Sequence, residues 1–174
     1  MNKSNVDFRG MSFLFRIRDL FHPPIEKVEK AGINEGDYVL DYGCGPGSYT
    51  LAAAEKVGPN GRVVAADIHP LAIKKVENKA NKKNFKNIET IQTDCKTNLE
   101  DNTIDVIICF DVLHGIEDKE CIIKEFFRVL KPNSILSFDD HHMKEDEIIE
   151  LITLNNLFEL KKKREKQYNF IKIE

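Results

Sequence analysis

Acidic residues stand at the ends of five apolar runs, and their positions suggest a shared ligand site. They are Asp41, Asp67, Asp94, Asp111 and the pair Asp139 and Asp140. In an open parallel sheet, ligands bind beyond the carboxyl ends of the strands, near the point where strand order reverses. A single aspartate could simply cap the next helix. Several such residues at one edge of the sheet favour a ligand-binding or catalytic site.

A glycine-rich loop follows the first of these runs. Gly43, Gly45 and Gly47 alternate with other residues, and Ser48 stands where the third glycine of the dinucleotide fingerprint G-x-G-x-x-G would fall. The loop also lacks the lysine of the phosphate-binding pattern G-x-x-x-x-G-K-[ST]. It therefore fits a dinucleotide poorly and a nucleoside triphosphate worse.

The next two acidic residues indicate what the loop holds instead. Asp67 lies 20 residues after Gly47, a position from which a carboxylate accepts hydrogen bonds from both ribose hydroxyls. Asp94 can accept a hydrogen bond from the exocyclic amine of adenine. The pattern predicts a ligand that contains adenosine without a pyrophosphate.

The elements that must position these residues alternate between strand and helix. Strands are expected at 38–42, 62–67, 88–94, 105–111 and 134–140, with helices at 49–57, 70–84, 119–131 and 144–156. Their continuous apolar character is typical of buried parallel strands, and residues 157–174 predict a hairpin. The fold class is α/β: a Rossmann-like, doubly wound seven-stranded sheet, mostly parallel, with a C-terminal antiparallel hairpin.

The region before the first strand is expected to be helical. Apolar residues recur at helical spacing over 8–21, and Pro24 can open a second short helix that reaches about Ala31. The apolar face of the first helix has three interpretations: core packing, a lid over the site, or docking on a membrane surface. We divide one domain, 1–174, into this segment (1–31), a cofactor-binding core (32–140), and a helix with the terminal hairpin (141–174).

Composition narrows the class of protein. A chain of 174 residues is long enough for one well-buried core. Its net charge of -3 gives no reason to expect nucleic acid as a partner. Four separated cysteines indicate reduced thiols and a cytoplasmic location. The charged N-terminus argues against stable membrane insertion, and the oligomeric state stays open.

Five stretches together resemble a known family. "VLDYGCGPGSYT", "VVAADIHP", "IETIQTDC", "DNTIDVIICFDVLHGI" and "FFRVLKPNSILSF" are similar, in that order and spacing, to class I S-adenosylmethionine-dependent methyltransferases. The resemblance runs from about Gly32 to Asp140. Within the family, "LH" and "RVLKP" resemble the branch that includes the ubiquinone and menaquinone biosynthesis methyltransferases.

The resemblance implies a role in holding S-adenosylmethionine for residues along the sheet edge. The methionine part would contact Asp41 and the backbone of Gly43, Cys44, Gly45 and Gly47. Asp67 would accept from the ribose hydroxyls, and Ile68 would pack on the adenine. Asp94 would accept from the adenine amine, and Cys95 would supply a backbone donor. Phe110 and Asp111 would lie beside the sulfonium.

The stretch "DDHHM" leaves three interpretations open. It can be a polar loop with a helix cap, or His141 or His142 can accept a proton or contact the acceptor, together with Asp111. The third is a metal, because carboxylates at these two strand ends resemble the magnesium site of catechol-type methyltransferases. Adjacent histidines are softer than magnesium prefers, and the resembled branch needs no metal, so none is expected.

The predicted function is transfer of a methyl group from S-adenosylmethionine to a small-molecule acceptor by direct displacement. Such a reaction mainly requires that the two reactants be aligned and water excluded. Two alternatives are a non-catalytic S-adenosylmethionine-binding or sensor protein and an NAD(P)-dependent oxidoreductase. Ser48 and Asp94 count against the oxidoreductase.

Overall fold

The computed structural model describes residue 21 and residues 23–173, and every structural statement below refers to these residues. The apolar stretch 8–21 lies outside this part of the chain except for Phe21. Its three interpretations therefore stay predictions.

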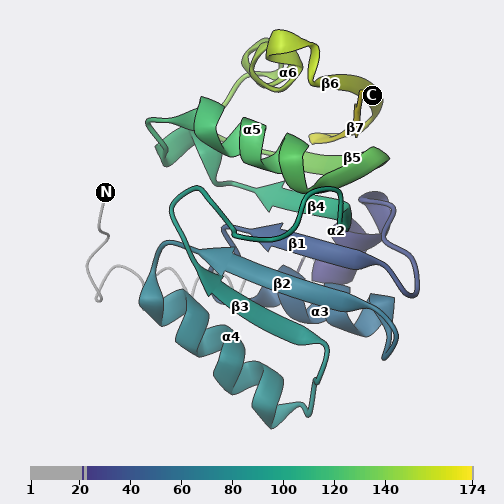
Figure 1. Cartoon of the computed structure of the whole chain (residues 1–174), viewed down its shortest axis with the longest axis vertical. Helices are drawn as coiled ribbons and strands as arrows, with labels where there is room; N and C mark the ends of the chain where they lie inside the picture. Colours follow the sequence, from purple (N-terminus) through teal and green to yellow (C-terminus); the bar gives the residue numbers. More distant parts are fainter. Residues whose placement is uncertain (1–20, 22, 174) are drawn as a thin grey trace.

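Seven strands form a single sheet in the order β3-β2-β1-β4-β5-β7-β6 (Figure 1). The bounds are β1 Tyr38–Tyr42, β2 Arg62–Asp67, β3 Ile88–Gln92, β4 Ile104–Phe110, β5 Leu130–Asp139, β6 Phe158–Arg164 and β7 Gln167–Lys172. Strands β1 to β5 pair in parallel, whereas β7 pairs antiparallel with both β5 and β6. The predicted fold class, including the terminal hairpin, is confirmed. Strand order reverses between β1 and β4, which places the expected ligand site there.

The helices begin where the sequence supplies start signals. Proline occupies the first turn of both α2 (Pro24–Lys30) and α4 (Pro70–Lys82). The other helices are α3 (Ser48–Val57), α5 (Lys119–Val129) and α6 (Glu145–Thr153), with 3-10 turns η1 (Leu113–Gly115) and η2 (Leu154–Asn156). The Asp118 side chain caps α5 by accepting a hydrogen bond from the backbone N–H of Cys121 (3.0 Å).

Two hydrophobic layers pack the helices on the sheet. Leu40 and Tyr42 of β1 belong to a core cluster with side chains of α5 and α6, whereas Val39 belongs to another cluster with α2 and α3. This division follows from strand geometry, because successive side chains point to opposite faces. The two clusters cover opposite faces of the sheet, and the carboxyl ends of the parallel strands lie between them.

The boundary between α5 and β5 differs from the prediction. Helix α5 ends at Val129, and β5 begins at Leu130, two residues before Pro132, so the expected helix end at 131 and strand start at 134 are wrong. A residue that precedes proline is pushed out of the α region. In addition, Leu130 is fully buried against the core, and Lys131 forms an ion pair with Asp105 (2.6 Å). Burial and pairing therefore favour the extended form.

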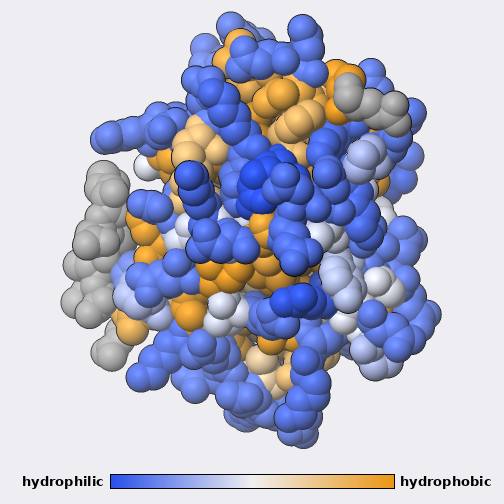
Figure 2. Space-filling model, in the orientation of Figure 1, coloured by the Kyte–Doolittle hydropathy of each residue, from blue (hydrophilic) through white to orange (hydrophobic). Residues whose placement is uncertain are grey.

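The face of the molecule that Figure 2 presents is mainly hydrophilic. Figure 2 shows apolar patches only between charged and polar side chains on the face that it presents. Among the described helices, none has both the length and the apolar character needed to cross a membrane.

Candidate functional site

The glycine loop needs its glycines for two different reasons. All three glycines, Gly43, Gly45 and Gly47, have positive φ, at 76°, 51° and 81°. Residues that carry a side chain rarely adopt this backbone conformation. A Cβ on Gly43 would lie 2.3 Å from a methyl of Val112, so there the backbone must pack closely. A Cβ on Gly45 would meet nothing nearer than 4.0 Å. Gly45 therefore leaves open space at the switch point of the sheet.

Asp41 lies beneath this loop and is buried. Its Oδ2 accepts a hydrogen bond from Thr50 Oγ1 of α3 (2.6 Å). Burial raises the pKa of Asp41 to about 7, although the Thr50 hydrogen bond opposes that rise. A nearby ammonium group would favour the charged carboxylate. Such a residue suits the amino end of a methionine moiety.

Asp67 ends β2 and ties the loop to the next strand. Its two oxygens accept hydrogen bonds from the backbone N–H groups of Gly45 (2.9 Å) and His69 (2.8 Å). A carboxylate has about four acceptor positions, so capacity is left for ribose hydroxyls. The neighbouring Ile68 side chain is 51% exposed and can cover an adenine ring. Open space, carboxylates and an exposed apolar side chain fit an adenosine ligand.

Asp94 and Cys95 follow β3 in a bend, where Asp94 is exposed and Cys95 is half-buried. The Cys95 backbone N–H already donates to Thr93 Oγ1 (3.2 Å), so it is engaged locally. Cys95 also forms a disulfide with Cys121 of α5. The expectation that all four thiols are reduced is therefore wrong for this pair. Sequence spacing could not reveal the bridge, because the two cysteines are 26 positions apart.

Cys44 and Cys109 are free thiols and both are buried. Burial raises the pKa of each thiol well above its ordinary value. Neither is suited to act as a nucleophile. Cys44 is thus a loop residue, despite its position among the glycines.

Asp111 follows β4 and has an unusual backbone. Its φ is +57°, in the left-handed region, and its N–H donates to the Asp139 carbonyl on β5 (2.9 Å). Its Oδ1 accepts hydrogen bonds from the backbone N–H of His141 (2.9 Å) and from the His141 ring at Nδ1. Strained backbone of this kind is concentrated at functional sites. Two predicted residues, Asp111 and His141, are thereby brought together.

Asp140 forms a second such arrangement beside the first. Its side chain accepts hydrogen bonds from the ring Nδ1 of His114 (3.0 Å) and from the backbone N–H of His142 (3.0 Å). The centres of the His114 and His142 rings lie 4.2 Å apart. His142 therefore joins a group with His114 and Asp140, whereas Asp111 pairs with His141.

Lys27 is a site residue that sequence reasoning missed. This lysine of α2 forms an ion pair with Asp139 at the end of β5. Its Nζ also lies 4.9 Å from the centre of the Phe110 ring, which packs edge-on against Tyr49 with 5.0 Å between ring centres. The only sequence signal was a lysine in a short helix, which is most often a solvated side chain.

Three side chains at this edge could in principle hold a metal ion. Asp111, Asp139 and His141 each offer a ligand atom, and these atoms lie within 4.8 Å of one another. Two carboxylates and an imidazole suit a divalent transition metal. However, the Lys27 ammonium already pairs with one of the carboxylates.

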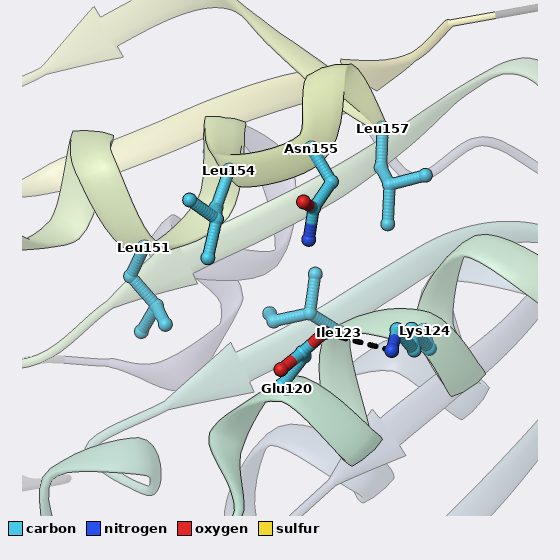
Figure 3. A pocket seen from close by; sticks show the side chains of 7 residues that line it. All are labelled: Glu120, Ile123, Lys124, Leu151, Leu154, Asn155 and Leu157. Carbon is cyan, nitrogen blue, oxygen red and sulfur yellow. Dashed lines mark ion pairs between the residues drawn. The ribbon is translucent and has the colours of Figure 1, made fainter.

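A shallow pocket lies elsewhere, between α5 and the α6–η2 segment. Figure 3 shows Leu151, Leu154 and Leu157 facing Ile123 across it, with the ion pair between Glu120 and Lys124 at its rim (2.7 Å). None of the residues expected to bind cofactor or acceptor lines it. It is therefore distinct from the site at the sheet edge.

Solved structures of similar fold include methyltransferases. A crystal structure of a SAM-dependent methyltransferase from Aquifex aeolicus is 25% identical, with a TM-score of 0.75, and the match covers 86% of this chain and 87% of that one. A putative S-adenosyl-L-methionine-dependent methyltransferase from Methanococcus maripaludis has a TM-score of 0.75 at 18% identity and covers 99% and 96% of the two chains. The second likeness shows the fold alone.

Curated relatives extend the comparison to sequence. A demethylmenaquinone methyltransferase from Lactobacillus johnsonii is 30% identical over 60% of this chain, and the chain spans 44% of that relative's length. A ubiquinone/menaquinone biosynthesis C-methyltransferase from Hydrogenovibrio crunogenus is 33% identical over 63% of the chain, again with 44% of its length covered.

The family described as "Methyltransferase domain" matches residues 33–172, which include the glycine loop, the acidic strand ends and the terminal hairpin. This match covers most of the chain, and the residues at the sheet edge fit an adenosine ligand. The chain therefore belongs to the family of methyltransferase domains, and its cofactor is S-adenosylmethionine.

Proposed function

We propose that the protein transfers the methyl group of S-adenosylmethionine to a small-molecule acceptor that loses a proton on methylation, with His141 as the proton acceptor. The observation that carries this proposal is the contact of the His141 ring with Asp111, next to Phe110. The cofactor supplies an electrophilic methyl carbon when it is bound. What the chain must add is alignment, a water-poor site and a place for the acceptor's proton.

The pairing with Asp111 determines which nitrogen of His141 is available. The Asp111 carboxylate accepts a hydrogen bond from Nδ1–H of the ring, which leaves Nε2 as the basic nitrogen. The backbone N–H of His141 donates to the same Asp111 oxygen, which fixes the position of the ring. After proton uptake, Asp111 would stabilise the imidazolium. This is the arrangement that a general base requires.

The donor side would be held by the remaining strand ends. Asp67 would accept hydrogen bonds from the ribose hydroxyls, Ile68 would cover the adenine, and Asp94 would accept from its amine. Asp41 would face the methionine ammonium. Phe110 would lie beside the sulfonium, where its buried ring excludes water.

The acceptor class is suggested by the names of the relatives. Because two of them are demethylmenaquinone and ubiquinone/menaquinone methyltransferases, we propose a hydroquinone-type aromatic acceptor. Its ring becomes a much stronger nucleophile when a hydroxyl loses its proton. Neither nucleic acid nor inserted membrane is part of this proposal. A cytoplasmic location is retained as part of it.

The test combines binding and turnover. S-adenosylhomocysteine should raise the melting temperature, while NAD at equal concentration should not. Asp67→Asn should remove that shift, whereas His141→Gln should keep it. With donor labelled in its methyl group, wild type should label a reduced naphthoquinone lacking a 2-methyl group, and His141→Gln should lose at least a hundredfold in rate.

The same measurements decide against the proposal in two ways. Stabilisation by NAD alone would favour the oxidoreductase. Binding of S-adenosylhomocysteine without transfer to a hydroquinone, a catechol or a primary amine would favour a sensor protein. Full activity of His141→Gln would remove this residue as the base.

A further inference from the structure

A positive charge already lies among the three potential metal ligands. The Lys27 ammonium pairs with Oδ2 of Asp139, and the Asp139 carboxyl belongs to the cluster with Asp111 and His141. The Asp139 side chain is only 4% exposed. Burial raises the pKa of this carboxyl, and the nearby Lys27 opposes that rise. The lysine thus supports the charged form of a buried acid.

Lys27 is held in place on several sides. Its backbone carbonyl accepts hydrogen bonds from Ala31 of the same helical segment (2.9 Å) and from Gln167 Nε2 of β7 (3.0 Å). Its Nζ lies 4.9 Å from the centre of the Phe110 ring and 5.7 Å from that of Tyr49. Aromatic faces attract an ammonium at such distances. The position of the charge is therefore built by α2, α3, β4, β5 and β7 together.

We propose that Lys27 is the resident cation of the acceptor side: it occupies the place of a metal ion at Asp111, Asp139 and His141 and keeps that cluster free of metal. A divalent ion there would be repelled by the ammonium and would compete with it for Asp139. His141 stays unligated as a result, which leaves its basic nitrogen free for a proton. Lys27 is then a positioning residue for Asp139.

This inference deepens the proposed function, and it rests on that function only for the role of His141. The exclusion of metal can be tested without donor or acceptor. Lys27→Met removes the charge and keeps an unbranched side chain that is one atom shorter. Lys30→Met is the matched control, because Lys30 lies one turn further along α2 and pairs with the exposed Glu165 (3.1 Å).

The experiment is a titration with Mn²⁺, in which electron paramagnetic resonance measures the free ion. We expect Lys27→Met to bind one Mn²⁺ at least tenfold more tightly than wild type or Lys30→Met. Lys27→Arg, which restores the charge, should return the affinity to that of wild type. Adding His141→Gln to Lys27→Met should abolish the gained site. A purely structural role for Lys27 would not create a new metal site.

The proposal is overturned if wild type binds Mn²⁺ as tightly as Lys27→Met, or if Lys27→Met gains no site. Stabilisation by S-adenosylhomocysteine is measured on every variant in parallel. It shows that the variant is folded and retains its donor site. If S-adenosylhomocysteine does not stabilise wild type, that result counts against the proposed function alone, whatever the Mn²⁺ titration shows.

Discussion

Thr50 donates a hydrogen bond from Oγ1 to Oδ2 of Asp41 over 2.6 Å, and both residues are buried. This contact joins the first turn of α3 to the end of β1 directly below the glycine loop. Burial nevertheless raises the pKa of Asp41 to about 7. A carboxyl that titrates near neutral pH therefore lies at the site expected for the methionine part of the cofactor.

The stability of the ligand-free protein should depend on this carboxyl. Because its pKa is higher in the folded chain than the ordinary 3.8, the folded state holds the proton more tightly. Its contribution is fully present below about pH 4 and is lost as the pH rises to about 7. A shift of this size corresponds to about 4 kcal/mol. Asp41→Asn should match wild type in melting temperature at pH 4 and exceed it at pH 8.

Ligand binding provides the control for this prediction. The cofactor ammonium should favour the charged carboxylate, so S-adenosylhomocysteine should reduce the difference between the two proteins at pH 8. It should also bind more weakly to Asp41→Asn. Equal melting temperatures of the unliganded proteins at both pH values would show that folding does not raise the pKa of Asp41.

The open space at Gly45 leads to a prediction about binding. Gly45→Ala places a methyl in the left-handed region and should cost about 1 kcal/mol. Gly36→Ala is the matched control, because Gly36 also has positive φ, at 86°, and no neighbour within 4 Å. Both variants should lose similar stability in urea. Only Gly45→Ala should weaken S-adenosylhomocysteine binding, and equal affinities in calorimetry would contradict a ligand at this loop.

The bridge between Cys95 and Cys121 should stabilise the fold. Closing a loop across a sequence separation of 26 reduces the entropy of the unfolded chain, which corresponds to about 3.5 kcal/mol of stabilisation. A reducing agent should therefore lower the urea midpoint of wild type. The double variant Cys95→Ser with Cys121→Ser should unfold at the midpoint of the reduced protein and ignore the reductant. A wild-type midpoint that does not respond to reduction would mean that the bridge is not formed.

Glu125 of α5 should stabilise the protein mainly above pH 4. Burial alone would raise its pKa, but hydrogen bonds from Arg128 and Thr97 outweigh burial and lower the pKa to about 2. The stabilisation is present above the ordinary value of 4.5 and is lost as the pH falls towards 2. At pH 7, Glu125→Gln should cost about 2 kcal/mol, and the difference should shrink at pH 3.

Glu120→Gln is the control on the same helix. Glu120 pairs with Lys124 four residues later (2.7 Å) on the exposed side, so its loss should cost less than about 0.5 kcal/mol. Denaturant unfolding at pH 3 and pH 7 measures the free energy of unfolding of both variants. A Glu125 effect that is equal at pH 3 and pH 7 would contradict the lowered pKa.

Local patterns were sufficient to predict most of the sheet. The expected strands at 38–42 and 62–67 have the bounds of β1 and β2, because a buried parallel strand is a continuous apolar run between breaking residues. The terminal hairpin also follows from alternation along the chain. The contact between Asp111 and His141 was partly foreseeable, since both follow neighbouring strands.

Long-range pairs were not predictable in the same way. The partner of Asp139 is Lys27, on a helix before the first strand, and the partner of Cys95 is on α5. The hydrophobic periodicity of the sequence does not indicate such pairs, because they depend on how the helices pack on the sheet. The end of α5 was misplaced for a related reason: burial of Leu130 outweighs the helical pattern that continues through it.

The pairing of Lys27 with Asp139 joins residues that are 112 positions apart, and this separation orders the assembly of the site. During synthesis, the chain that carries β1, β2 and β3 emerges first, with the glycine loop, Asp67 and Asp94. Lys27 meets its counter-ion only after β5 has left the ribosome and joined the sheet. Contacts at such separation form late and slow folding. The residues expected to hold the methyl donor are therefore synthesised well before Asp139, the partner of Lys27 on the acceptor side, is available.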